Sequence, residues 1–259
     1  MLLAMMLLGC KGVEPAPKAF DDLMHYFWQK HEQGDDSELA DGLVNLAEAF
    51  PTLDPPDGSV TELTNGEIGL VGVSRSDAKD AVGLFMSNRF GCSRPQLEAS
   101  LSYKNQDELH TTTYETYDRQ FDNSRDDWLA GDTDLLTWDV DYRVEQLGIK
   151  YEAETEGFLR LVPDLGADES PFGSFLVART HFPRPAEFDG DNKKQFQQDY
   201  QLEIYWFEGG KTHHVYALWR DFDFGSGYKS GNETAQRLLL NALYDWDDET
   251  EEGCQEGLP

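Results

Sequence analysis

The chain has 259 residues, of which 39% are hydrophobic and 12% aromatic, so it is long enough and apolar enough to bury a sizeable core. Fifty acidic residues against 21 basic ones give it a net charge of −29 at pH 7. This charge excludes a nucleic-acid partner, because phosphate binding requires a basic surface, and it disfavours docking onto anionic lipid head groups.

The first ten residues, MLLAMMLLGC, form an apolar stretch that ends in Leu7-Leu8-Gly9-Cys10. Two leucines followed by a small residue and a cysteine resemble the lipobox of bacterial lipoproteins. The resemblance implies a signal peptide over residues 1–9, diacylglycerol on the Cys10 thiol, a lipidated tether over 10–17 and a place in the bacterial cell envelope, with the membrane as a partner. The stretch is too short to span a bilayer itself. The alternative is a frayed hydrophobic start with an incidental cysteine.

If Cys10 carries lipid, Cys92 and Cys254 remain as an even pair in an oxidising compartment. Each of them follows a glycine just beyond a predicted helix. We therefore predict a disulfide between Cys92 and Cys254. Two free thiols are the alternative for a cytoplasmic protein.

Residues 18–50 predict a helical hairpin that opens a single domain over 18–259. One apolar stripe runs from Phe20 to Trp28, and a second runs from Leu39 to Phe50, with Ser37 as its cap and Pro51 after its end. Each apolar face needs a partner, which the sheet-and-helix body over 60–250 is expected to supply.

The next segment is harder to assign. Residues Thr52–Thr64 predict a proline-rich loop, Glu67–Val73 a strand and Arg75–Phe90 a third helix with apolar residues at helical spacing. Residues Thr111–Phe121 have the composition of a strand, whereas the acidic stretch Asp122–Asp134 predicts an exposed excursion.

Strand signals dominate from Trp138 onwards. Residues Trp138 to Glu145 alternate apolar and polar side chains, which is typical of a strand with one wet face. The alternation continues over Ile149–Thr155, a turn is predicted at Glu156-Gly157, and Phe158–Val162 and Phe175–Phe182 predict two further strands.

Residues Asp199–Phe224 predict a β-hairpin around Gly209-Gly210, because glycine adopts the positive φ angles of a tight primed turn without strain. The resulting register pairs Ile204 with Val215 on a core face, together with Leu202–Ala217, Tyr200–Trp219 and Trp206–His213. The opposite face is a mixed surface that can meet solvent, a ligand cavity or a covering helix. On or beside that face we expect the candidate ligand-facing residues: Tyr205, Phe207, His214, Tyr216 and Leu218.

Residues Asn232–Asp247 predict the last helix, with Ser230 and Glu233 at capping-box spacing. Its apolar stripe consists of Ala235, Leu238, Leu239, Ala242, Leu243 and Trp246. The predicted fold is therefore α+β, with an antiparallel sheet of about six to seven strands packed against the C-terminal helix. The order of elements over Glu67–Asp247 resembles the helix-grip layout of START-type ligand-binding domains, which implies a cavity between sheet and helix.

No motif for a P-loop, a dinucleotide fold, a serine hydrolase, a zinc protease or a CxxC redox pair occurs in the sequence. His213 and His214 are adjacent in a predicted strand, so they point to opposite faces and are expected to stack on Trp206 and Tyr205 instead of sharing a metal. Two acidic stretches, beginning at Asp189 and Asp221, start like calcium loops but do not continue as EF-hands. We accordingly assign no catalytic residue, metal or cofactor.

The leading hypothesis is a lipid-anchored envelope protein that binds an apolar small molecule or another envelope component. The alternatives are an envelope polysaccharide hydrolase with paired carboxylates and a purely structural adaptor. Two carboxyl groups facing each other across a cleft would favour the hydrolase, and an apolar pocket would favour binding.

Overall fold

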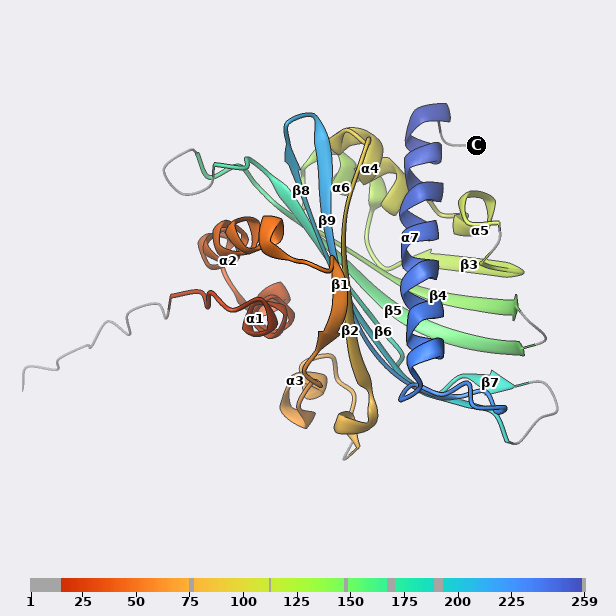
Figure 1. Ribbon diagram of the computed structural model, residues 1–259. Coiled ribbons are helices and arrows are strands. Elements are labelled where there is room, and N and C mark those ends of the chain that lie inside the picture. Colours follow the sequence, from red (N-terminus) through yellow and green to blue (C-terminus); the bar gives the residue numbers. More distant parts are fainter. Residues whose placement is uncertain are drawn as a thin grey trace, which may run out of the picture.

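A computed structural model describes residues 15–74, 77–111, 113–146, 149–166, 171–188 and 193–257. The fold is α+β and has three layers: two N-terminal helices, one large antiparallel sheet and a long C-terminal helix on the opposite face (Figure 1). The predictions that concern residues 1–14, including the lipidation of Cys10, lie outside the described residues.

The sheet contains nine strands within the described residues, where six to seven were expected. Its order is β1-β2-β9-β8-β6-β5-β4-β3, and β7 pairs with part of β5. The strands are β1 (Asp57–Val60), β2 (Val82–Phe90), β3 (Thr116–Phe121), β4 (Leu135–Gln146), β5 (Ile149–Val162), β6 (Phe175–His181), β7 (Glu187–Phe188), β8 (Gln195–Glu208) and β9 (Lys211–Asp223).

The helices divide between the two faces of the sheet. Helices α1 and α2 lie on one side, while α7 and the short α4 to α6 lie on the other (Figure 1). Their bounds are α1 (Phe20–Gln33), α2 (Asp36–Ala49), α3 (Asn65–Gly69), α4 (Arg94–Leu101), α5 (Gln106–Leu109), α6 (Arg125–Ala130) and α7 (Glu233–Glu256). Among the described residues, none of the helices has both the length and the apolar character that crossing a membrane requires.

The β8–β9 hairpin has the register that the sequence predicts. Gly209 and Gly210 adopt φ angles of 60° and 78° at the turn, and Glu208 faces Lys211. All the predicted cross-strand pairs are present, from Trp206–His213 to Tyr200–Trp219. The predicted core face is confirmed: Leu202, Ile204 and Trp206 are fully buried against the N-terminal helices.

Three predictions for the segment between α2 and β3 are wrong. Residues Asp57–Val60, within the predicted loop Thr52–Thr64, form strand β1, which pairs with β2. Residues Asn65–Gly69 form the short helix α3, because Thr64 and Glu67 make a reciprocal capping box that the strand prediction overlooked. Residues Val82–Phe90 form strand β2 instead of a helix. This strand is covered on both faces, so its buried residues run consecutively, and their apparent helical spacing was coincidental.

Three further boundaries differ from expectation. Glu156-Gly157 is not a turn but lies within β5, where Gly157 leaves room for the Trp138 ring: an added Cβ would lie 2.1 Å from it. The acidic excursion contains helix α6, which buries Trp128. The strand prediction over Thr111–Phe121 is confirmed only from Thr116.

Two helix caps are corrected as well. Asp35, not Ser37, caps α2, and Asn232, not Ser230, caps α7 through a hydrogen bond from the Ala235 amide. Helix α7 also extends nine residues beyond the predicted end at Asp247, because its polar second half packs along the sheet instead of ending in solvent.

Buried arginines attach the N-terminal helices to the sheet. Arg160 on β5 donates hydrogen bonds to the carbonyl oxygens of His31 and Gly34 (2.8 and 2.9 Å) and pairs with Asp36 at 2.7 Å. Arg179 on β6 pairs with Glu32 and lies against the Trp28 ring, 5.2 Å from its centroid. These contacts, added to the apolar core, hold the helical hairpin in one orientation.

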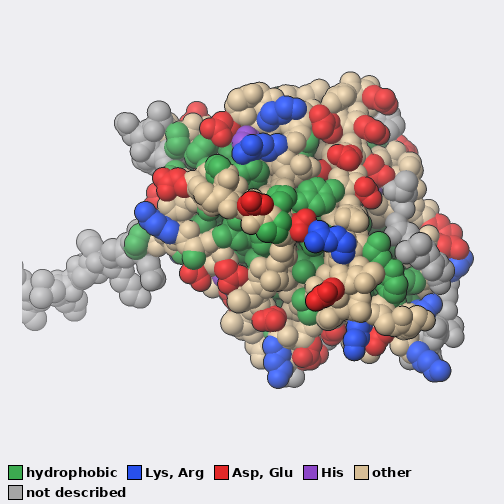
Figure 2. Space-filling view, viewed as in Figure 1, with side chains coloured by type: hydrophobic (Ala, Val, Ile, Leu, Met, Phe, Trp, Pro, Cys, Tyr) green, Lys and Arg blue, Asp and Glu red, His purple; other side chains and the backbone are tan. Residues whose placement is uncertain are grey.

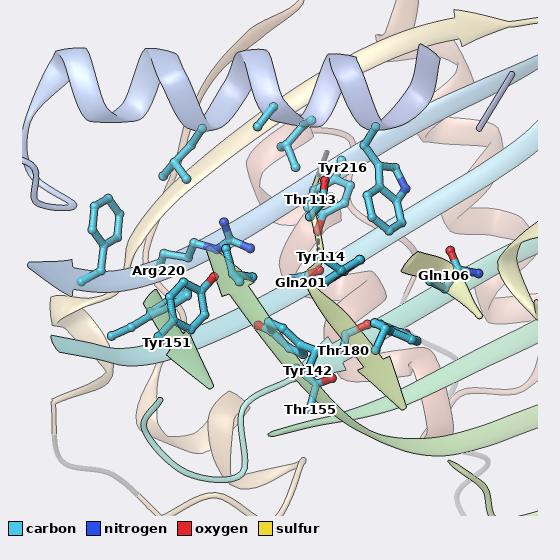
Figure 3. A pocket seen from close by; sticks show the side chains of 18 of the residues that line it. Gln106, Thr113, Tyr114, Tyr142, Tyr151, Thr155, Thr180, Gln201, Tyr216 and Arg220 are labelled. Carbon is cyan, nitrogen blue, oxygen red and sulfur yellow. Dashed lines mark hydrogen bonds between the residues drawn. The ribbon is translucent and has the colours of Figure 1, made fainter. Parts of the chain in front are cut away.

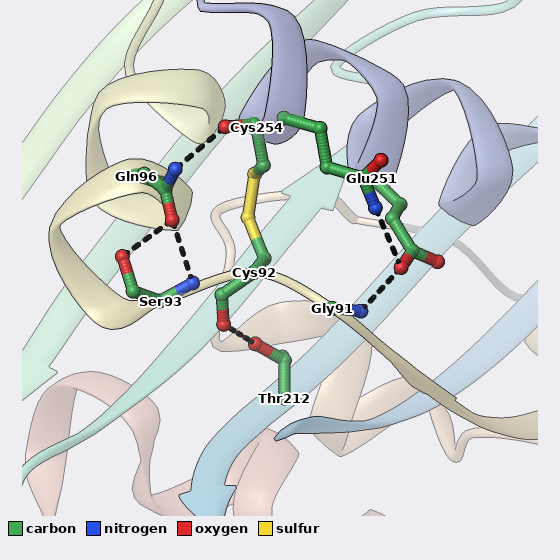
Figure 4. The surroundings of a disulfide bond; sticks show 8 residues. Gly91, Cys92, Ser93, Gln96, Thr212, Glu251 and Cys254 are labelled. Atoms are coloured by element: carbon green, nitrogen blue, oxygen red, sulfur yellow. Dashed lines mark hydrogen bonds between the residues drawn. A yellow bond between two sulfur atoms is a disulfide. The ribbon is translucent and has the colours of Figure 1, made fainter. Parts of the chain in front are cut away.

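The predicted disulfide is present. Cys92 follows β2 and Cys254 lies in the last turns of α7, with Cα atoms 5.6 Å apart (Figure 4). Gln96 Nε2 donates to the Cys254 carbonyl at 2.6 Å, and the Thr212 hydroxyl donates to the Cys92 carbonyl at 2.7 Å. The C-terminal end of α7 is therefore tied covalently to the sheet.

The outer face of α7 accounts for part of the acidic surface. Figure 2 shows carboxylates gathered over the C-terminal half of this helix, where Asp245, Asp248, Glu252 and Glu256 are exposed. Partial burial, and then repulsion from Asp245, Asp247 and Glu251, raise the pKa of Asp248. Covalent and hydrogen-bonded ties to the sheet oppose this repulsion.

Removing the disulfide should therefore destabilise the protein. The two cysteines are 162 residues apart. In the chain-entropy account, closing so long a loop lowers the entropy of the unfolded chain and so stabilises the folded protein by up to about 5 kcal/mol. We expect the Cys92→Ala, Cys254→Ala double variant to lose most of this free energy of unfolding in urea titrations. Equal stability of the variant and the wild type would contradict the expectation.

Candidate functional site

A cavity of about 360 Å³ lies between the sheet and α7. Figure 3 shows side chains from the strands and from the helix pointing into this space. Eleven of the lining residues are aromatic: Tyr114, Tyr117, Trp138, Tyr142, Tyr151, Phe196, Tyr216, Phe222, Phe224, Tyr228 and Trp246. Aromatic and aliphatic side chains therefore make up most of the cavity wall, with polar groups among them.

The periodicity of each element determines which residues reach the cavity. All six members of the apolar stripe predicted for the last helix, from Ala235 to Trp246, line the cavity. On β4, the alternation predicts that Trp138, Tyr142 and Val144 share one face, and all three line it. The face of the hairpin opposite its core contributes Gln201, Glu203, Tyr216 and Arg220.

An arginine–aspartate pair lies at one end of this wall. Arg220 Nε and Nη2 bond the two carboxylate oxygens of Asp199 at 2.7 and 3.1 Å, and Asp199 is fully buried. Burial opposes the charge on Arg220, but Asp199 outweighs it and raises the pKa of the guanidinium. The third nitrogen, Nη1, has no hydrogen-bond acceptor among the described residues, so it remains available to a ligand.

The other polar groups are mostly hydroxyls. Burial raises the pKa of Tyr151 to about 12, partly offset by the positive charge of Arg220, so this hydroxyl is neutral. The Tyr216 hydroxyl donates to Gln201 Oε1. The hydroxyls of Thr155 and Thr180 complete this part of the wall. Such groups can orient a neutral molecule without adding charge.

A chain of buried polar groups runs from the cavity to α7. Glu203 lines the cavity and accepts a hydrogen bond from the Tyr205 hydroxyl. His214 Nε2 is 3.5 Å from Glu203 Oε2, and His214 Nδ1 is 2.9 Å from Asp247 Oδ1 on α7. Asn88 on β2 donates to the same Asp247 at 3.0 Å. The chain therefore joins β2, β8 and β9 to the middle of the covering helix.

His214 is held in its charged form by this chain. Burial alone would lower its pKa, but Asp247 and Glu203 outweigh that effect and raise the pKa to about 9. The imidazole also stacks on Tyr205, with ring centroids 4.0 Å apart, as the sequence predicts. On the other face, His213 packs against Trp206, but the two rings are tilted by 32° instead of being stacked as predicted. The two adjacent histidines thus have separate structural surroundings.

The five candidate ligand-facing residues occupy different positions around the cavity. Tyr216 lines it, whereas Tyr205 and His214 lie behind Glu203 in the polar chain. Leu218 packs beneath α7 against the apolar cluster that contains Leu240, and Phe207 packs against the cluster around the disulfide. The cavity therefore lies nearer the open end of the hairpin than its tip.

Sequence reasoning missed several lining residues. Tyr114 precedes β3 and Arg220 sits at the far end of β9, more than 100 positions apart in the chain, so no local pattern connects them. The hairpin register did contain one signal, because Gln201 and Glu203 share the mixed face with Tyr216. That alternation identifies the face but not which part of it α7 leaves uncovered.

The described residues contain no cluster of three or more side chains suited to hold a metal ion. In the stretch that begins at Asp221, Asp223 Oδ1 instead accepts a hydrogen bond from the Gly225 amide at 2.8 Å, which closes a turn. The other calcium-like stretch, over 189–192, lies outside the residues described.

No protein-family model and no curated protein matches the chain. Among solved structures, it is similar to a START superfamily protein from Mycobacterium smegmatis, with 9% identity, a TM-score of 0.43 and coverage of 67% of this chain and 97% of that one. It is also similar to a protein from Thermus thermophilus, with 14% identity, a TM-score of 0.35 and coverage of 66% and 93% respectively. Sequence identities and TM-scores this low assign neither a family nor a ligand to the chain.

The state of His214 is open to a direct test. Because its folded-state pKa lies above 6.5, its contribution to stability is complete below pH 6.5 and is lost as the pH rises through about 9. We expect NMR titration to show the His214 ring still protonated at pH 8, and urea unfolding to show stability falling as the pH approaches and passes 9. His213, whose pKa burial lowers, is the internal control. A His214 ring that is neutral at pH 8 would contradict this assignment.

Proposed function

We propose that this protein binds a small, uncharged, flat apolar molecule in the cavity between the sheet and α7. The observation that carries the proposal is the composition of the wall: eleven aromatic rings and three charged side chains, each of which has a partner within the protein. Binding sites for small molecules commonly combine a mainly apolar wall with a few placed polar groups.

The charges in the wall favour a neutral ligand. Arg119 bonds the Tyr117 hydroxyl and two backbone carbonyls, Glu203 is bonded by Tyr205, and Arg220 is paired with Asp199. A charged ligand would have to lose its hydration without an unpaired counter-ion to receive it, which is costly in an apolar site. A ring system loses little hydration and gains contacts with aromatic side chains.

The free Nη1 of Arg220 supplies an orienting contact. An oxygen acceptor on the ligand, such as a carbonyl, can bond this nitrogen while Asp199 continues to balance the charge. One end of the ligand is then held by hydrogen bonding, and the rest is held by apolar burial.

The hydrolase hypothesis finds less support in this cavity. Glu203 is the one carboxylate among the described lining residues, so the cavity lacks the facing pair of acids that glycoside hydrolysis needs. Asp199 lies behind the wall, where it is fully buried and occupied by Arg220.

We also propose that the chain is held at a bacterial membrane by lipid on Cys10, as the sequence Leu7-Leu8-Gly9-Cys10 suggests. The described chain starts beside α2, where Asn45 donates hydrogen bonds to the carbonyls of Ala16 and Pro17 at 3.0 and 2.9 Å. The chain thus leads to the helical layer on the face opposite the cavity, which would leave the cavity directed away from the attachment point.

A substitution that fills the cavity tests the binding proposal. Ala178 lines the cavity from β6, so Ala178→Phe places a ring where the ligand would lie. With the neutral dye N-phenyl-1-naphthylamine as probe, we expect saturable fluorescence enhancement by the wild type and at least about tenfold weaker binding by the variant. Ala130→Phe, an exposed position on α6, is the matched control and should bind as the wild type does. Unchanged affinity in a folded Ala178→Phe variant would refute the proposal.

The anchor has its own test. After expression in a bacterium with lipoprotein processing, mass spectrometry of the mature N-terminus should find diacylglycerol on Cys10, and Cys10→Ser should move the protein from the membrane to the soluble fraction. An unmodified Cys10 in a soluble wild-type protein would rule out the anchor and leave the cavity proposal intact.

A further inference from the structure

We infer that Glu203 determines the specificity of the cavity by accepting a hydrogen bond from an uncharged donor group, such as a hydroxyl, on the bound molecule. The inference rests on the proposed function and adds to it the chemistry of the ligand's second polar group. Arg220 donates a hydrogen bond to an acceptor at one end of the ligand, and Glu203 accepts a hydrogen bond from a donor at the other end.

The two oxygens of Glu203 have different surroundings. Oε2 accepts the hydrogen bond from Tyr205 and lies 3.5 Å from His214 Nε2. Oε1 has no hydrogen-bond partner among the described residues, yet it is not one of the unpartnered atoms sealed from solvent. Since the side chain lines the cavity and is only 14% exposed, Oε1 opens into the cavity.

An open carboxylate oxygen in an aromatic wall selects for donors. Ionised carboxylates accept hydrogen bonds at both oxygens, and a bond to a charged group contributes roughly 1.5–3 kcal/mol. An acceptor placed at the same point would be repelled. A ligand that brings a hydroxyl to Oε1 therefore binds more tightly than an analogue in which that hydroxyl is methylated.

Tyr205 and His214 hold Glu203 in position for this role. They occupy Oε2 from the side of the sheet, so the carboxylate cannot turn away without breaking a buried contact. In the hairpin register Glu203 is opposite Tyr216, which is four residues from Arg220. At about 3.3 Å per residue, the backbone positions of Glu203 and Arg220 are about 13 Å apart along the strand direction. This separation sets the length of a ligand that can contact both side chains.

The experiment compares two probes that differ in one donor: 2-naphthol and 2-methoxynaphthalene, measured by calorimetry at pH 7. We expect the wild type to bind 2-naphthol about tenfold more tightly. In Glu203→Gln, the Tyr205 hydroxyl needs an acceptor, so the amide oxygen should take the Oε2 position and the NH₂ group should face the cavity. The preference for naphthol should then disappear or reverse.

Glu208→Gln is the matched control, because Glu208 lies on the same strand but its side chain is 59% exposed at the hairpin tip. It should keep the tenfold preference. Equal binding of both probes by the wild type would overturn the role of Glu203 while leaving the cavity function standing. Loss of the preference in Glu208→Gln as well would assign it to net charge and also overturn the role. If neither probe binds the wild type, both proposals fail. The wild-type comparison can overturn the role of Glu203 even if Glu203→Gln does not fold.

Discussion

The register of the β8–β9 hairpin is the constraint on which the other features depend. Gly209 and Gly210 close the turn, and from there each residue of the two strands is assigned to one face of the sheet. One face packs Ile204 and Trp206 against the N-terminal helices, and the other presents Glu203 and Arg220 to the cavity. A slip of one residue would exchange these sets, burying charges in the apolar core and leaving the cavity without polar groups.

Helix α7 completes the cavity because it is attached along its length by different kinds of contact. The disulfide at Cys254 ties its C-terminal end to the sheet, and the His214–Asp247 pair ties its middle. Nearer its N-terminus, Arg237 pairs with Asp57 at 3.1 Å, in a contact that is largely exposed and hence weak. The helix is thus held more firmly at the end distant from Leu238 and Leu239, which line the cavity.

The charge of the molecule is distributed in two distinct ways. Outside, acids are in large excess, including those along the outer face of α7, where mutual repulsion opposes compact packing. Inside, each charged side chain of the cavity wall has a partner, such as Asp199 for Arg220. A highly charged exterior opposes self-association, and a balanced interior leaves the apolar wall available to a neutral guest.

The sequence alone determined the elements whose side chains repeat with a clear period and whose turns have unambiguous chemistry. The hairpin register, the strand around Tyr142 and the apolar stripe of α7 all follow from local spacing, as does the pairing of Cys92 with Cys254 once an oxidising compartment is assumed. The tertiary structure decided the rest. Strand β2 was predicted as a helix because burial on both faces removes the alternation of apolar and polar side chains that identifies a strand. Helix α7 continues past Asp247 because packing against the sheet supports its acidic second half. The cavity itself depends on Tyr114, Tyr151 and Arg220, which come together only when distant strands pair, and no local pattern records such pairing.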